Sequence, residues 1–172
     1  TMEISMPSDK EDVKEENQTQ VAASKAITIL IDKDNTLYYF KGKPNGGTDV
    51  VDEGKLFETT YGKNGLRKVL LESNPEAVKA VEKLKAEFAT KKTSNVQDEV
   101  KVKAEYKERL SQIKNAEYTP SVIIKATDEA TYDNLIQVLD EMQICSIGRY
   151  VIDKFADGDK QKIDAYKNGS AQ

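Results

Sequence analysis

The chain has 172 residues, of which 33% are charged and 38% hydrophobic, and its formal net charge is −4. This length predicts a single domain, and the acidic balance argues against a nucleic-acid-binding protein, which would normally present a basic face. The chain has no histidine, so it lacks the commonest metal ligand and the most versatile acid–base group at neutral pH.

The single cysteine, Cys145, cannot form a disulfide within the chain. Because it lies among apolar residues and has no histidine to activate it, we expect a buried, unreactive thiol rather than a nucleophile. No pair of carboxylates or lysines has a spacing that would force it into a catalytic arrangement. The sequence therefore predicts that the protein is not an enzyme and has neither a metal site nor a cofactor.

Residues 1–25 are polar and acidic, which predicts a flexible linker. The chain contains no run of about 18 apolar residues and does not open with a signal peptide. Within the linker, Ile4 and Met6 alternate with polar residues just before Pro7. This short motif fits an extended edge segment, although an apolar pair in a flexible tail is the simpler interpretation.

Residues 26–41 predict a β-hairpin. Isoleucine recurs at every second position from Ile27 to Ile31, the residues at 32–35 favour a turn, and β-forming aromatic residues follow at 37–40. A third short strand is predicted at 55–61. Leucine and valine at helical spacing then predict a helix over 65–72.

Residues 73–116 predict an antiparallel helical hairpin. Asn74 followed by Pro75 is typical of a helix start, and Ser94 with Gln97 resembles a capping box that would open the second helix. The helices carry apolar seams and charged outer faces. Two interpretations stay open, namely a solvated arm and a docking or coiled-coil surface.

Residues 120–155 predict a strand, a helix and a second strand, which in this arrangement would be parallel. Asp128 is placed to cap the helix, whose apolar stripe would run from Tyr132 to Met142 through Leu135, Ile136 and Leu139. Gly148 would supply unusual backbone angles in the return to the second strand. Beyond Phe155 we expect an acidic turn at 156–159, a helical turn at 160–166 and a frayed end. The acidic turn does not complete the calcium-binding EF-hand pattern.

Together these elements predict an α/β domain of mixed α+β type over residues 26–172. A small mixed sheet would be packed by two helices in the order hairpin, helix and βαβ unit, with the helical hairpin inserted at about 73–116. The predicted core consists of Ile27, Ile29, Ile31, Leu66, Val69, Leu70, Ile123, Leu135, Ile136, Leu139 and Ile152.

The βαβ stretch also carries a family resemblance. The run Val122-Ile123-Ile124-Lys125-Ala126-Thr127-Asp128, followed by Tyr132, Leu135, Val138, Leu139, Asp140 and Ile147-Gly148, resembles the signature of the ExbD/TolR family. Ile4-Ser5-Met6-Pro7 is similar to the linker motif of that family. The upstream hairpin and the helix at 65–71 occur in the family's order.

The resemblance implies the periplasmic domain of an inner-membrane protein, anchored by an N-terminal transmembrane helix that this chain does not include. It implies an ExbB-like channel subunit and a TonB-like protein as partners, a homodimer, and force derived from the proton-motive force. The partner-binding residues would be Ile4, Met6, Pro7, Asp128 and Tyr132, and a physical means would be addition of a strand to an open sheet edge. The alternatives are a TolR-like domain that binds peptidoglycan and a cytosolic adaptor built on the helical hairpin.

Overall fold

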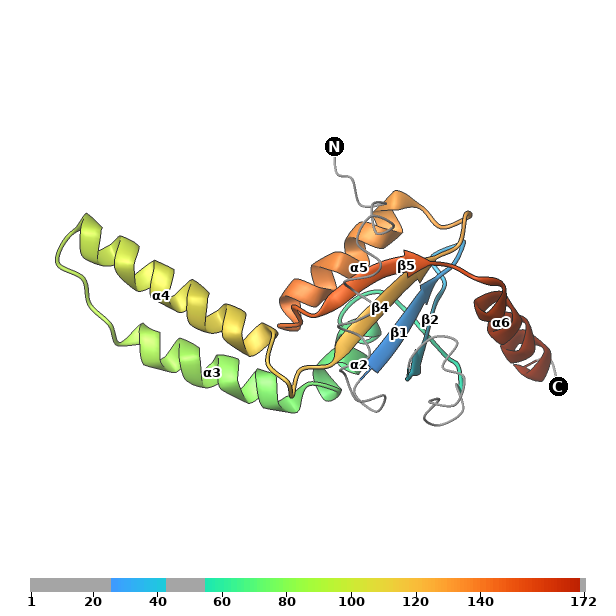
Figure 1. Ribbon diagram of the computed structural model, residues 1–172, viewed down its shortest axis with the longest axis horizontal. Helices are drawn as coiled ribbons and strands as arrows, with labels where there is room; N and C mark the ends of the chain where they lie inside the picture. The colour runs from blue at the N-terminus through green and yellow to red at the C-terminus, as the bar shows by residue number, and fades with distance from the viewer. Residues whose placement is uncertain (1–25, 43–54, 171–172) are drawn as a thin grey trace.

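The computed structural model describes residues 26–42 and 55–170, which form one five-stranded mixed sheet flanked by helices (Figure 1). The predicted linker at 1–25, with Ile4, Met6 and Pro7, lies outside the described residues. The strands are β1 (Ala26–Ile31), β2 (Leu37–Lys41), β3 (Phe57–Thr59), β4 (Ser121–Ala126) and β5 (Tyr150–Lys154). Their order across the sheet is β3-β2-β1-β4-β5. The mixed α/β fold class is therefore confirmed.

The predicted hairpin and βαβ unit are both present. β1 is antiparallel to β2, whereas β4 lies parallel to β1 on one side and to β5 on the other. In the turn between β1 and β2, Asp34 and Asn35 have φ values of 57° and 59°. Asp and Asn tolerate this left-handed conformation better than most residues, so the local sequence favours this reversal of the chain.

One face of the sheet is covered by α2 (Leu66–Glu72) and α5 (Tyr132–Ile144), as Figure 1 shows. Alternate residues of β1 and β4 point into this main core and meet Leu70 of α2 and Met142 of α5. Of the predicted core residues, Ile27, Ile29, Ile31, Leu66, Leu70 and Ile123 are buried, whereas Val69, Leu135, Ile136, Leu139 and Ile152 are only half-buried.

Of the predicted apolar stripe of α5, Met142 is buried and Leu135 and Leu139 pack against the main core, whereas Tyr132 was wrongly placed in it. The helix is capped by Thr131, whose hydroxyl accepts from the backbone N–H of Asn134, and Asp128 does not cap it. The buried face contains Asn134, Val138 and Met142, while Tyr132 is 56% exposed. Asn134 is buried because it donates to the side-chain oxygen of Asn35, and a search for apolar residues alone overlooks such a position.

The prediction for Gly148 was also wrong. Ser146, not Gly148, adopts the left-handed conformation in the return from α5, with φ of 61°. A Cβ atom at Gly148 would lie 3.0 Å from the side-chain oxygen of Asn115. Glycine is therefore favoured at position 148 by this close approach and not by its backbone angles.

The acidic turn predicted at 156–159 is instead the start of a 14-residue helix, α6 (Asp157–Ser170). The carboxylate of Asp159 accepts from the backbone N–H of Ala156 and so satisfies a free donor at the helix start. Ile163 and Tyr166 pack against the second face of the sheet. The helical turn predicted at 160–166 lies inside this helix, and the greater length of the helix depends on these tertiary contacts.

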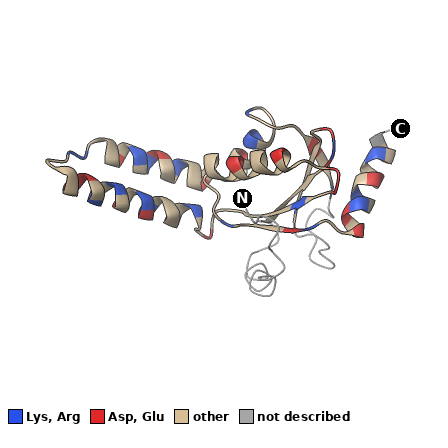
Figure 2. Ribbon diagram, turned by 90° about the horizontal axis from the view of Figure 1, so that it is seen from above, with Lys and Arg blue, Asp and Glu red and all other residues tan. Residues whose placement is uncertain are grey.

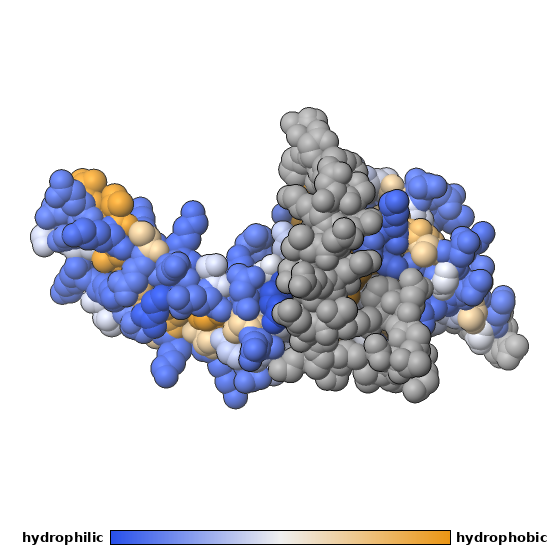
Figure 3. Space-filling model, viewed as in Figure 1, coloured by the Kyte–Doolittle hydropathy of each residue, from blue (hydrophilic) through white to orange (hydrophobic). Residues whose placement is uncertain are grey.

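The predicted helical hairpin consists of α3 (Pro75–Ala89) and α4 (Val96–Lys114), which run side by side away from the sheet (Figure 1). The cap of α4 is Asn95, whose side chain accepts from Asp98 N–H, and not Ser94 as predicted. Residues of both charge signs line the two helices (Figure 2). At the outer end an apolar patch is visible in Figure 3, where Val96 and Val100 are exposed.

Candidate partner-binding site

The edge strand β5 is the first candidate. Within the described residues β5 pairs only with β4. The backbone carbonyl of Arg149 accepts from Val122 N–H of β4. Because backbone groups of successive strand residues point alternately to the two sides, those of Tyr150 and Ile152 point away from β4. Tyr150 and Ile152 therefore present backbone donors and acceptors at an edge that is unpaired among the described residues and can accept a further strand. Lys154 points outward as well, but its N–H already donates to the Asp153 carboxylate over 2.7 Å.

The opposite edge is less suited to strand addition. β3 has three residues, and its Phe57 ring stacks on Tyr39 of β2 with ring centroids 5.3 Å apart. A strand of this length offers few backbone groups, and short edge strands are one means by which proteins limit unwanted pairing. β5, with five residues, is the longer of the two edges.

A polar network lies where β1 and β4 end. The hydroxyl of Thr127 donates to the Asp32 carboxylate over 3.1 Å, and Asn134 bonds Asn35 over 2.8 Å. These bonds join the turn after β1 to the connection that leads from β4 into α5. No pattern in the sequence predicted this network, although the Asp and Asn residues of the first turn were an available signal.

Asp128 and Tyr132, two of the predicted partner-binding residues, both lie in or next to this connection and are exposed. Since Ala126 is paired with Lys154, the connection starts beside the end of β5. The structure thus places both residues at the same end of the sheet as the terminus of the open edge. The other three, Ile4, Met6 and Pro7, lie outside the described residues.

The helical hairpin is attached to the turn that leads into β5. Asn74, just before α3, donates to the carbonyl of Cys145 over 3.3 Å. At the end of α4 the carbonyl of Lys114 accepts from Gly148 N–H over 2.9 Å, and the Arg149 side chain donates to Ala116 O over 3.1 Å. Both roots of the hairpin therefore bond to the turn that precedes the open edge. The sequence gave no signal for this attachment.

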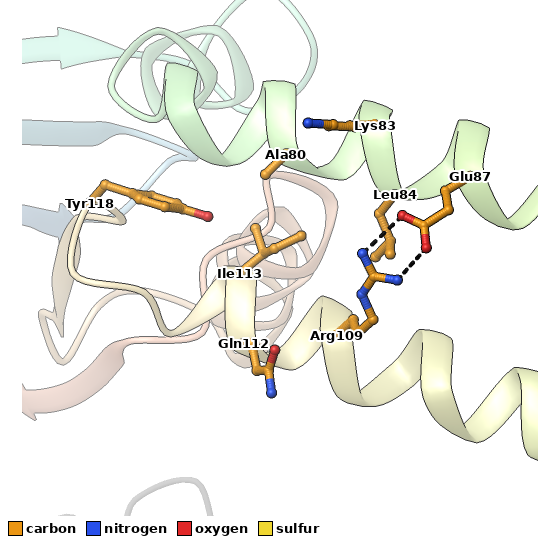
Figure 4. A pocket seen from close by; sticks show the side chains of 8 residues that line it. All are labelled: Ala80, Lys83, Leu84, Glu87, Arg109, Gln112, Ile113 and Tyr118. Carbon is orange, nitrogen blue, oxygen red and sulfur yellow. Dashed lines mark hydrogen bonds and ion pairs between the residues drawn. The ribbon is translucent and has the colours of Figure 1, made fainter.

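A hollow of about 360 Å³ lies between α3 and α4 near these roots (Figure 4). Ala80, Leu84 and Ile113 contribute apolar surface, and Lys83, Glu87 and Arg109 contribute charges. The Arg109 guanidinium spans the gap and donates twice to the Glu87 carboxylate, once over 2.9 Å. The bridge lowers the pKa of the Glu87 carboxyl. It engages two of the three charged side chains that line the hollow, those of Glu87 and Arg109.

The remaining candidates for chemistry are the buried thiol of Cys145 and the hydroxyl of Tyr61. Burial raises the pKa of the Cys145 thiol to about 12, with a smaller contribution from the nearby Glu141 carboxylate. Little thiolate would therefore form at neutral pH. Burial also raises the pKa of Tyr61 to about 12. Residues 26–42 and 55–170 contain no cluster of three acidic or cysteine side chains that could hold a metal ion.

The fold and this geometry define a small α/β domain with a mixed sheet, an edge strand, β5, that pairs on one side only among the described residues, and a projecting helical hairpin. Residues 1–155 match the family described as biopolymer transport protein ExbD/TolR. The chain therefore belongs to the ExbD/TolR family, and α6 lies beyond the matched residues. Comparisons with curated proteins and with solved structures each found no significant match.

Membership of the ExbD/TolR family indicates the general class of protein to which this chain belongs. The ExbD/TolR family is a non-enzymatic family of energy-transducing biopolymer-transport proteins. Its members are membrane-associated and work in complexes with other membrane proteins. Within the described part of this chain, no helix is both long enough and apolar enough to cross a membrane.

Proposed function

We propose that this chain is the periplasmic domain of an ExbD-like subunit in a complex driven by the proton-motive force. A transmembrane helix outside this chain would anchor the subunit in the inner membrane, beside an ExbB-like channel subunit. The domain would act as a homodimer and relay force to a TonB-like partner for outer-membrane transport. The family match over residues 1–155 is the observation that carries this proposal.

The open edge of β5 supplies the physical means. An extended segment of the TonB-like partner would pair with the outward backbone groups of Tyr150 and Ile152. Such main-chain hydrogen bonds give affinity, while nearby side chains give specificity. Tyr132 and Asp128 are exposed near the end of this edge and would supply side-chain contacts that give specificity. Residues Ile4 to Pro7 of the chain itself would compete for the same edge.

A force relay also needs a rigid path from the edge into the domain. β5 is in register with β4 from Val122 to Ala126, and β4 is in turn paired along its length with β1. A pull on β5 along the strand direction would load these hydrogen bonds together rather than one after another. The central strands, with buried residues throughout β1, would distribute the load through the main core.

The direct test is a titration of the isotope-labelled chain with peptides from the periplasmic part of a TonB-like protein of the same organism. We expect amide shifts in β5, largest at Tyr150 and Ile152, with smaller shifts at Asp128 and Tyr132. Shifts confined to the helical hairpin, with none in β5, would contradict strand addition.

Two proline substitutions make the test specific. Ile152→Pro removes an outward N–H and keeps every donor that points to β4, so the domain should fold and lose peptide binding. Val151→Pro removes a donor that points to β4 and should destabilise the sheet itself. If Ile152→Pro binds peptide as tightly as the unsubstituted chain, the β5 edge is not the site.

The alternative within the same family is a TolR-like domain that binds peptidoglycan, and the match does not distinguish the two. Co-sedimentation with purified cell wall separates them. An ExbD-like domain should remain in the supernatant and bind the TonB-derived peptide. A TolR-like domain should sediment with the wall and show no response to that peptide.

A further inference from the structure

A second hollow, of about 460 Å³, lies between the turn that joins β1 to β2 and the C-terminal half of α6. Its volume is within the usual range for sites that bind small ligands. Its lining includes Asp32 and Asp34 of the turn, Tyr38 of β2, Glu58 of β3 and Tyr166 of α6. The family match ends at residue 155, so the wall formed by α6 lies beyond the matched residues.

Several contacts hold α6 in place as a wall of this hollow. The ammonium nitrogen of Lys125 on β4 lies 2.8 Å from Oδ2 of the buried Asp159. Nζ of Lys162 lies 4.7 Å from the centroid of the Phe40 ring, and Ile163 is buried against the same face of the sheet. The wall is therefore fixed to the sheet, and the hollow has a defined shape.

Tyr38 brings a hydroxyl without a partner to the hollow. The residue is 3% exposed, and within the described residues its hydroxyl makes no hydrogen bond. Its ring meets that of Tyr166 edge-on, with the centroids 5.6 Å apart. Burial raises the pKa of Tyr38, and so do the nearby carboxylates of Glu58 and Asp32. Because the hydroxyl of so buried a tyrosine normally finds a polar partner, it is available to a ligand in the hollow.

Asp32 presents a carboxylate oxygen in a fixed position. The residue is 7% exposed, and its Oδ1 accepts from the backbone N–H of Lys33 over 2.8 Å and from the Thr127 hydroxyl over 3.1 Å. Its Oδ2 accepts no hydrogen bond within the described residues. Asp34 and Glu58 are exposed in the same lining, and no ion pair of the described residues involves either of them.

The charges of the lining favour a cation. Lys33 and Lys167 also line the hollow, so three carboxylates face two ammonium groups and leave one net negative charge. Both lysines are exposed, and a flexible lysine stem can carry its ammonium group into water. The Asp32 carboxylate is buried and held by two hydrogen bonds, so its charge stays at the hollow.

The spacing of the carboxylates favours a large cation over a metal ion. Among residues 26–42 and 55–170 no three acidic side chains are close enough to hold a metal ion. A guanidinium group has five N–H donors that point in several directions from one plane, and it stacks on aromatic rings. An ammonium group is a compact point charge. Separated carboxylates beside two tyrosine rings therefore match a guanidinium group.

We propose that this hollow binds an alkylguanidinium group, such as the arginine side chain of a partner. Asp32 Oδ2 and the Glu58 carboxylate accept from different N–H groups, and the Tyr38 hydroxyl accepts from a third. The Tyr166 ring covers one face of the group. The hollow adjoins β2 and β3, whereas β5 is the opposite edge of the sheet. Binding here is therefore independent of strand addition at β5.

The direct test titrates the isotope-labelled chain with butylguanidinium and with a blocked pentapeptide that carries one arginine between alanines. We expect saturable amide shifts at residues 32–38 with both probes, and tighter binding of the peptide would assign the group to a polypeptide. The same peptide with citrulline, which has the shape of arginine without its charge, should bind at least about tenfold more weakly. Equal binding of the two peptides, or no shifts at 32–38, would overturn the proposal.

Two variants test the buried groups of the lining. Asp32→Asn keeps an acceptor oxygen for Lys33 and Thr127 and removes the charge, so it should weaken binding of the arginine peptide at least about tenfold. Tyr38→Phe keeps the ring and should weaken binding about threefold. Protection of the buried Cys145 thiol from thiol reagents reports that each variant is folded. Unchanged affinity in a folded Asp32→Asn variant would rule out this site.

A matched pair of exposed residues tests the charge without risk to the fold. Glu58→Gln should weaken binding about threefold. Glu82→Gln makes the same change in net charge on α3, which does not line the hollow, and should have no effect. Equal affinities of these two variants would mean that the peptide responds only to the overall charge of the chain, and the proposal would be wrong.

The sign of the ligand's charge has its own test. Lys167→Gln removes a like charge from the lining, so it should strengthen binding of the arginine peptide, whereas a site for an anion would be weakened. Amide shifts separate this hollow from the β5 edge. Shifts at Tyr150 and Ile152 with none at 32–38 would overturn the guanidinium site and leave the proposed strand addition untouched.

Discussion

The sheet with α2 and α5 and the hairpin of α3 and α4 are stabilised by different forces. In the sheet region all six residues of β1 are buried, and apolar side chains from two helices close the main core. In the hairpin α4 has 19 residues and buries none of them. Its contacts with α3 include the Phe88–Tyr106 ring pair and the exposed Arg109–Glu87 ion pair.

This difference indicates which region determines the folding stability and which region can open locally. Apolar burial is the dominant favourable term in folding, whereas exposed ion pairs contribute little and are screened by salt. The sheet region should therefore determine the global free energy of unfolding. The outer hairpin should open locally at a lower free energy, as is usual for segments with few buried contacts.

The largest effect is expected from a core truncation. Ile124 is fully buried in β4, between β1 and β5, so Ile124→Ala should lower the free energy of unfolding by about 2–5 kcal/mol. Urea denaturation measures this change. The matched control Ile144→Ala, at a residue that is 50% exposed, should change it by less than about 0.5 kcal/mol. Equal effects at the two positions would mean that the core is wrongly placed.

The thiol of Cys145 gives a second measure of the same core. Because Cys145 is fully buried and burial raises its pKa to about 12, maleimide at neutral pH should label it only when the sheet region opens. The labelling rate should rise with urea in parallel with unfolding. Rapid labelling in the absence of urea would show that the core is accessible to solvent.

Shortening the hairpin should have a smaller effect. Residues 86–107 contain no buried side chain, so their replacement by a short turn leaves Leu84 and the hairpin roots in place. We expect a small shift in the urea midpoint and unchanged protection of Cys145. A large loss of stability would show that the outer hairpin supports the sheet.

The ion pair of the hairpin should make its local opening sensitive to pH and salt. Arg109 lowers the pKa of Glu87 in the folded chain, so this contribution to stability is present above the ordinary glutamate pKa. It is lost as the pH falls through the lowered value. The hydrogen-exchange protection of α4, corrected for the intrinsic exchange rate at each pH, should fall in acid and at high salt, and Glu87→Gln should remove most of that dependence. If protection depends on pH and salt in the same way in the unsubstituted chain and in the Glu87→Gln variant, this prediction is wrong.

The smallest effect is expected at Tyr61, whose hydroxyl is buried without a hydrogen-bond partner in the described residues. Tyr61→Phe removes an unsatisfied group and should leave stability unchanged or raise it by less than about 0.5 kcal/mol. Because burial raises its pKa to about 12, the folded chain retains this proton where the unfolded chain loses it. The free energy of unfolding therefore falls in alkali. The Tyr61→Phe variant, which lacks this hydroxyl, should lose less of it. A marked destabilisation would indicate a missed hydrogen bond.

Much of the fold could be predicted from local pattern. The alternation of apolar and polar residues predicted β1, the aromatic β-formers predicted β2, and the turn residues at 32–35 predicted the hairpin between them. An apolar strand followed by a long helix predicted the βαβ unit. These features depend on period and turn chemistry, which act over a few residues. The same patterns also gave the hairpin of α3 and α4 and its antiparallel pairing. For the candidate site, the partner-binding role of Asp128 and Tyr132 stays a prediction, although both residues lie near the end of β5. The β5 edge itself could not be assigned before the strand order was known.

Tertiary contacts decided what local pattern could not. The burial of Asn134 in α5 depends on Asn35 at the other end of the sequence, and the length of α6 depends on Lys125 and the second sheet face. Polar residues become buried when a distant partner satisfies them, and no periodicity in a single segment reveals that partner. The sequence by itself thus determined the family resemblance and most of the elements, but not the length of α6. The tertiary structure determined which edge is open, where the hairpin is anchored and what α6 covers, because each depends on residues far apart in the chain.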